Sequence, residues 1–63
     1  MSFDLEDRVS TTRILKFGSQ LELPEGSMGT IVGSGPIRSN VNFDDDTLAN
    51  YRRVDNEDLK KSD

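Results

Sequence analysis

The stretch that decides the fold is residues 23–32, which read LPEGSMGTIV, followed further along the chain by residues 41–44, VNFD. A turn containing proline and glycine leads into a short β-branched run, and a second such run ends in acidic residues. Pro24 sets φ at the second turn position, and Gly26 supplies a positive φ near the end of the turn. Gly29 inside a strand indicates a close backbone crossing. Together these features predict a very small β-barrel.

Outward from this stretch, the β-branched segments between turns have the composition of strands. We expect strands at residues 8–14, 28–32, 37–43 and 48–54, and a short fifth strand at Leu59. Residues 15–25 contain Gly18 and Pro24, which oppose both helix and ladder, so we expect a long loop there. Residues 55–58 are expected to form one helical turn, with Asp55 as its N-cap.

The period-two alternation of strands also predicts the core. Its expected members are Val9, Ile14, Leu23, Ile31 or Val32, Val41, Phe43, Val54 and Leu59. At the start of the chain, residues 1–6 are rich in acidic side chains and are expected to form a flexible leader. Residues 7–60 are then the barrel domain, and residues 61–63 are a C-terminal tail.

Composition limits the function further. Sixty-three residues allow one domain. The absence of cysteine and histidine excludes disulfides, soft metal sites and histidine-based catalysis, and it favours a cytoplasmic location. No apolar run is long enough to insert into a membrane. We therefore expect a protein that is not an enzyme and binds no cofactor and no metal.

Three motifs resemble those of the SH3-like small-barrel superfamily. Residues 29–32 (GTIV) are similar to its second strand, residues 41–44 (VNFD) to its third, and Val54 with Asp58 and Leu59 to its closing element. Similar patterns occur in photosystem I reaction-centre subunit IV, in the ferredoxin-docking subunit of the cyanobacterial NDH complex, and in KOW-type and Tudor-like modules. The resemblance implies an all-β, five-stranded SH3-like barrel with one short 3-10 turn before the last strand.

The candidate binding residues lie on the third and fourth expected strands. They are Arg38, Tyr51, Arg52 and Arg53, with Arg13 as a further candidate. Arginine and tyrosine are enriched at binding hot spots, and clustered arginines receive acidic partners. The alternative is that these arginines pair with nearby aspartates and that Tyr51 belongs to the core.

Two other features have competing interpretations. Residues 44–46 (DDD) could hold a hard cation, but they lack a calcium-loop pattern, so we favour a solvated turn. Phe17, in the long loop, is either an exposed adhesive surface or a plug for the barrel end, and we favour the plug.

The leading hypothesis is a non-catalytic protein-interaction module, an accessory subunit or adaptor that binds a protein partner through the third and fourth strands, with help from the loop at residues 33–36. The first alternative is a KOW-type nucleic-acid-binding module, although the net charge of −4 disfavours nucleic acid. The second alternative is a small acidic inhibitor, for example from a phage, that presents carboxylates in place of phosphates.

Overall fold

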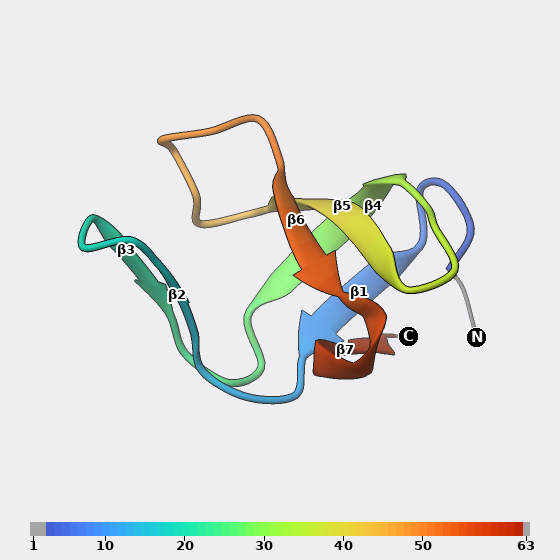
Figure 1. The fold of residues 1–63 in the computed structure, drawn as a ribbon, viewed down its shortest axis with the longest axis horizontal. Coiled ribbons are helices and arrows are strands. Elements are labelled where there is room, and N and C mark those ends of the chain that lie inside the picture. Colours follow the sequence, from blue (N-terminus) through green and yellow to red (C-terminus); the bar gives the residue numbers. More distant parts are fainter. Residues whose placement is uncertain (1–2, 63) are drawn as a thin grey trace.

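The computed structural model describes residues 3–62 (Figure 1). The strands, in chain order, are β1 (Arg8–Thr11), β2 (Leu15–Phe17), β3 (Leu21–Leu23), β4 (Met28–Gly33), β5 (Arg38–Phe43), β6 (Arg52–Asp55) and β7 (Leu59–Lys61). One 3-10 turn, η1 (Asn56–Asp58), precedes β7, and no α-helix occurs in the described residues. The radius of gyration is 10.3 Å, which is the compactness expected of a folded chain of this length.

The strands form two antiparallel sheets. The larger one is five-stranded with the order β6-β5-β4-β1-β7, and the smaller one pairs β2 with β3. The β2–β3 hairpin projects to one side of the larger sheet (Figure 1). β6 and β7 are the two edges of the larger sheet and are not neighbours in it, so the strands do not close into a barrel. The three-residue η1 connects β6 to β7. It leads the chain from one edge of the sheet to the other, so β6 and β7 do not form a hairpin.

The core is close to the expected one. Its buried apolar members are Val9, Leu15, Leu23, Ile31, Val41, Phe43, Val54 and Leu59. The expectation for Ile14 is wrong, because its side chain is 52% exposed. Of the two alternatives Ile31 and Val32, Ile31 is the buried one. The error at Ile14 arises because β1 ends at Thr11 and the chain bends before β2, which brings Leu15 inward instead.

A buried hydroxyl explains why β1 ends where it does. The Thr11 hydroxyl donates to the Pro24 carbonyl (3.1 Å) and accepts from the Ser27 N–H (3.1 Å). These bonds tie the end of β1 to the turn that precedes β4. Gly26 adopts φ +87° in that turn, as its position predicts.

Residues 15–25 form a hairpin, not the loop that we expected. Leu15, Lys16 and Phe17 pair with Leu23, Glu22 and Leu21, respectively. The alternation of leucine and glutamate in residues 21–23 is a strand pattern, and Gly18, at φ +66°, supplies the bend of the hairpin. The fourth expected strand is also shorter: β6 begins only at Arg52, and residues 44–51 form a connecting loop.

The expected helical turn and the two ends of the chain are also described by the structure, except for residues 1, 2 and 63. η1 lies where the helical turn was expected, but the Asp55 side chain makes no capping bond to it. The Glu6 N–H donates to the Ile31 carbonyl (2.7 Å), and the Ser62 N–H donates to the Arg8 carbonyl (2.8 Å). The parts of the expected leader and tail that fall on residues 1, 2 and 63 lie outside the described residues.

Candidate binding site on the outer face of β5 and β6

The alternation of β5 and β6 separates an inner from an outer face. Val41 and Val54 are buried in the core. Their strand neighbours therefore point outward; the outward residues are Arg38, Asn40 and Asn42 on β5, and Arg53 and Asp55 on β6. In the register of the two strands Arg38 lies opposite Asp55 and Asn40 lies opposite Arg53. The outer face is thus polar, with two arginines at diagonal positions.

A shallow groove runs between this face and the loop that connects β4 to β5. Its lining residues are Gly33, Ser34, Pro36, Ile37, Arg38, Asn40 and Arg53. Ile37 is 71% exposed and precedes β5, although we expected it to be the first residue of the third strand. Ile37 and Pro36 also line a larger groove on the other side of the loop, beside η1 and β7. Ile37 is therefore an apolar side chain that stands between two hollows.

Hydrogen bonds from η1 hold this loop in place. The Asn56 N–H donates to the Ile37 carbonyl (2.8 Å), and the Asn56 side-chain amide donates to the Gly35 carbonyl (2.8 Å). The buried Ser39 hydroxyl donates to the Asn56 side-chain oxygen (2.6 Å). The backbone that carries Ile37 is thus braced against β5 and η1, which lowers the entropy lost when a partner binds.

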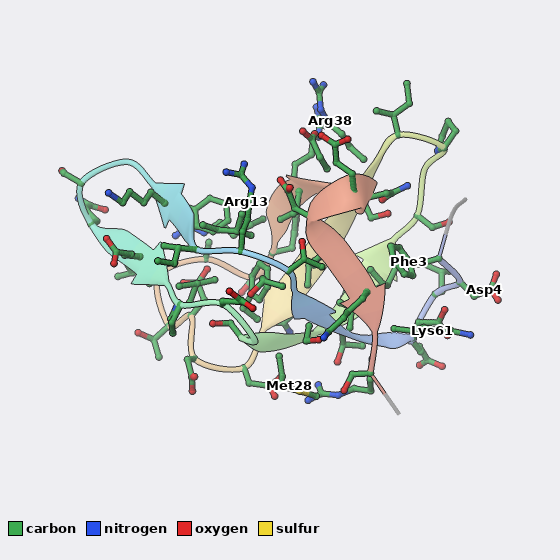
Figure 2. All side chains as sticks on the ribbon, turned by 90° about the horizontal axis from the view of Figure 1, so that it is seen from below. Phe3, Asp4, Arg13, Met28, Arg38 and Lys61 are labelled. Carbon is green, nitrogen blue, oxygen red and sulfur yellow. The ribbon has the colours of Figure 1, made fainter. Side chains whose placement is uncertain are left out.

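The four predicted partner-binding residues do not form one patch. Arg38 and Arg53 share the outer face, and Figure 2 shows Arg38 projecting away from the ribbon. Tyr51 precedes β6 and is 54% exposed, so it is not a core residue. Arg52 alternates with Arg53 and lies on the same side of β6 as the buried Val54.

Arg52 is engaged inside the molecule. Its guanidinium forms an ion pair with Asp46 (Nε to Oδ2, 2.8 Å), and only 24% of its side chain is exposed. The same guanidinium lies 5.1 Å from the centre of the Phe17 ring, within cation–π range. The Phe17 ring is in turn 6.2 Å from that of Phe43 in the core. Phe17 is thus half-buried and packs on the core instead of forming an exposed adhesive surface, although the open sheet has no barrel end for it to plug.

The remaining arginines, except for Arg53, also have carboxylate partners. Of the five arginines in the sequence, four form ion pairs: Arg8 with Asp44, Arg13 with Asp58, Arg38 with Asp55 and Arg52 with Asp46. Arg53 is exposed and makes no ion pair with residues 3–62. The outer face therefore presents one arginine whose charge no described carboxylate neutralises.

Residues 44–46 are not simply a solvated turn. The Asp46 side chain is 1% exposed; it accepts hydrogen bonds from the N–H groups of Leu48 (2.9 Å) and Ala49 (3.3 Å) as well as from Arg52. The bond from Arg52 is the main cause that holds the pKa of Asp46 below its ordinary value. Asp44 has a lowered pKa for the same kind of reason, a hydrogen bond from Arg8.

These interactions show what the arrangement can do chemically. Within residues 3–62 no cluster of three or more acidic side chains is placed to hold a metal ion. The same part of the chain contains no helix that is both long and apolar enough to cross a bilayer. The candidate site places a charged side chain, Arg53, and an apolar one, Ile37, on the lining of one groove.

Sequence reasoning missed two contributors to this surface. Ile37 follows Pro36 at the end of a turn that contains glycine, and this position signals a loop more than the first residue of a strand. Asn56 was expected only within a helical turn, and nothing in its sequence context indicates the bonds to Gly35 and Ile37. Comparison with known proteins gave no match for this chain: no protein-family model, no curated protein and no solved structure is significantly similar to it.

Proposed function

We propose that the chain is a non-catalytic protein-interaction module with a partly open SH3-like fold, an accessory subunit or adaptor of a larger assembly. The fold assignment rests on the order of the elements: a strand, a hairpin excursion, three strands, a 3-10 turn and a last strand. The partner binds to the outer face of β5 and β6, where Arg38, Arg53 and Ile37 lie around one groove.

The observation that supports this function best is the pairing of Ile37 with Arg53 on a braced backbone. Burying an isoleucine side chain contributes about 1.5–3 kcal/mol relative to leaving it exposed. The unpaired charge of Arg53 attracts an acidic partner and restricts how that partner docks. Arginine is among the residue types that are enriched at binding hot spots.

The two alternatives gain less from the structure. A nucleic-acid-binding module needs a basic surface free to contact phosphates, and four of the five arginines are engaged by aspartates. An inhibitor that imitates nucleic acid needs free carboxylates, and those of Asp44, Asp46, Asp55 and Asp58 are the ones that pair with these arginines. Neither alternative has a specific observation in its favour.

Affinity capture from cells of the source organism tests the proposal. The immobilised wild type is compared with the double variant Ile37→Ser/Arg53→Glu, which removes the anchor and reverses the charge. The control, Leu48→Ser/Lys60→Glu, makes the same chemical changes at exposed positions outside the β5–β6 face.

We expect the wild type and the control to capture the same protein and the site variant to capture at least tenfold less of it, since 1.4 kcal/mol corresponds to a factor of ten. Capture of that protein by the site variant at the wild-type level contradicts the proposed surface. Retention of the wild type on DNA or RNA, with a steep loss on adding salt, favours the KOW-type function instead.

A further inference from the structure

The outer edge of β6 has no strand partner among residues 3–62, because β6 is the last strand on its side of the larger sheet. Neighbouring pairs in an antiparallel ladder alternate between hydrogen-bonded and non-hydrogen-bonded. The Asn56 N–H donates to the Ile37 carbonyl, which fixes the alternation along β5 and β6. Val54 is accordingly hydrogen-bonded to β5, whereas Arg53 and Asp55 direct their N–H and C=O groups away from it.

This edge forms one wall of a groove of ≈ 510 Å³. The opposite wall is residues 13–17, which include β2. The strand partner of β2 is β3, which contributes no residue to this groove. Leu15, Phe17 and Val54 give the groove an apolar base that belongs to or packs against the core. An extended segment in this groove has the main-chain groups of β6 on one side and an apolar surface beneath it.

The charges around the groove favour an acidic occupant. Its two carboxylates, Asp55 and Asp58, already pair with arginines at 2.9 Å each. Arg53 makes no ion pair with the described residues, and Lys16 is 72% exposed at 3.9 Å from its carboxylate partner. The charge left without a close partner is therefore positive, in a chain whose net charge is −4.

The same charges disfavour a second copy of this chain as the occupant. The two free edges of the larger sheet each carry an exposed basic side chain that makes no ion pair with residues 3–62, Arg53 on β6 and Lys60 on β7. Pairing of these edges between two copies would place like charges opposite each other, which is destabilising. An acidic strand from another protein meets no such repulsion.

We propose that the groove between β2 and β6 binds an extended acidic segment of a partner protein, which adds to the edge of β6 as an antiparallel strand. Main-chain hydrogen bonds then give affinity, and alternate side chains give specificity. This inference rests on the proposed function and deepens it, because Arg53 lines both this groove and the one on the outer face.

The register predicts the pattern of the bound segment. Residues opposite each other in a sheet share a face, so the residue opposite Arg53 projects beside it and is acidic. The next residue points to the side of Arg52 and Val54, toward the apolar base, and is apolar. The N–H and C=O groups of Arg53 point away from β5, toward the bound segment. Arg53 and the acidic residue opposite it are therefore a hydrogen-bonded pair, in which the acidic residue points its own N–H toward β6. The N–H groups of the apolar residues point away from β6.

The test uses the isotope-labelled full chain and the probe peptide acetyl-Glu-Val-Glu-Val-Glu-amide, followed by amide chemical shifts. Two further peptides carry N-methyl groups either on the three glutamates or on the two valines, and a fourth replaces glutamate by lysine. We expect the probe to bind with a Kd on the order of 1 mM or tighter, with shifts at Arg53 and Asp55. N-methylation of the glutamates raises Kd at least tenfold, N-methylation of the valines leaves it within about twofold, and the lysine peptide does not bind.

Variants of the protein provide the second half of the test. Lys16→Glu, on the wall opposite β6, weakens binding of the probe, whereas Lys60→Glu, on the edge formed by β7, leaves it unchanged. Equal Kd values for the two N-methylated peptides, shifts confined to β7, or no shift at millimolar probe overturns the inference.

The failure of strand addition is distinguishable from the failure of the proposed function. Ile37 does not line the β2–β6 groove, so Ile37→Ser leaves binding of the probe peptide unchanged. In one outcome, Ile37→Ser alone loses the captured partner and the two N-methylated peptides bind equally. This outcome supports the proposed function of the outer face and contradicts strand addition. If the peptides behave as expected but capture is insensitive to Ile37, strand addition stands and the outer face is wrong.

Discussion

At the scale of single residues, Asp46 has the environment least expected from its sequence context. It lies in a run of three aspartates, yet its side chain is nearly fully buried and accepts three hydrogen bonds. These bonds connect the start of the β5–β6 loop to its middle and to β6. Asp46 therefore shapes the loop and also holds Arg52 on the core side of β6, whereas the alternation of the strand turns the adjacent Arg53 outward.

The variant Asp46→Asn tests this role. It removes the ion pair and leaves the buried part of Arg52 without a carboxylate, which is costly for a charged group. We expect the melting temperature to fall on the order of 5 °C, measured by circular dichroism. Asp45→Asn, at the exposed neighbouring position, is the control and leaves the melting temperature unchanged; an equal fall in both variants contradicts the role.

The acid stability of the protein follows from the same carboxylates. The pKa values of Asp46 and Asp44 lie below their ordinary value of 3.8, because Arg52 and Arg8 donate hydrogen bonds to them. A carboxyl group whose pKa is lower in the folded than in the unfolded state stabilises the fold. This contribution is complete above the pKa of the unfolded state and is lost as the pH falls through the pKa of the folded state. We expect the melting temperature to be constant between about pH 7 and pH 5 and to fall below about pH 4. The fall is smaller in Asp46→Asn; an identical acid profile in this variant counts against the effect.

At the scale of elements, the close packing of β4 beside β5 depends on Gly29, which lies opposite Phe43 in the sheet. A Cβ atom at Gly29 would lie 2.6 Å from Val41 Cγ1 and 3.0 Å from the Asn42 carbonyl oxygen. We expect Gly29→Ala to destabilise the protein by about 1–3 kcal/mol, the usual effect of overpacking a core, in urea denaturation. Ser19→Ala, in the exposed β2–β3 turn, is the control; wild-type stability of Gly29→Ala would show that β4 and β5 do not approach so closely.

The loop between β4 and β5 is held by hydrogen bonds from Asn56 in η1. Asn56→Ala removes the side-chain bonds to Gly35 and Ser39 and costs about 1–3 kcal/mol of stability. We expect hydrogen exchange to accelerate in residues 33–37, with β1 and β4 little affected. Asn50→Ala, at an exposed loop position, serves as the control. Unchanged exchange in residues 33–37 would contradict the bracing of Ile37.

These elements also show what the sequence could and could not predict. The turns at Pro24–Gly26 and after Gly33 are marked by local residues, and strands β4 and β5 follow from them. The end of β1 is set by bonds from Thr11 to a turn far along the chain, which no local pattern reveals. Ile14 was therefore assigned to the core in place of Leu15.

The candidate site was predictable only in part. The alternation of β6 places Arg52 with the buried Val54, so period two alone separates Arg52 from Arg53. The ion pair between Asp46 and Arg52 spans an irregular loop, and no periodicity predicts it. Assigning both arginines to one binding strip was an inference from composition, whereas their roles depend on which side of the strand each one occupies.

At the scale of the whole molecule, four of the five arginines pair with carboxylates of the same chain, and β6 and β7 are the two open edges of the larger sheet. The ion pairs of Arg8, Arg13 and Arg38 join segments far apart in the chain, and that of Arg52 spans the β5–β6 loop; Arg53 is left as the arginine available to a partner. Most of these pairs are exposed and each contributes little to stability. Their effect on the surface is larger, because they leave Arg53, which lines one groove with Ile37 and lies on the free edge of β6, as the arginine whose charge no described carboxylate neutralises.

The most direct test of this arrangement is an NMR titration of the isotope-labelled chain with the protein partner recovered by affinity capture. We predict chemical-shift changes clustered at residues 33–38 and along β6, with β1 and β7 unaffected. A cluster of changes on β1, on β7 or at the Arg8–Asp44 pair would contradict the outer face of β5 and β6 as the recognition surface.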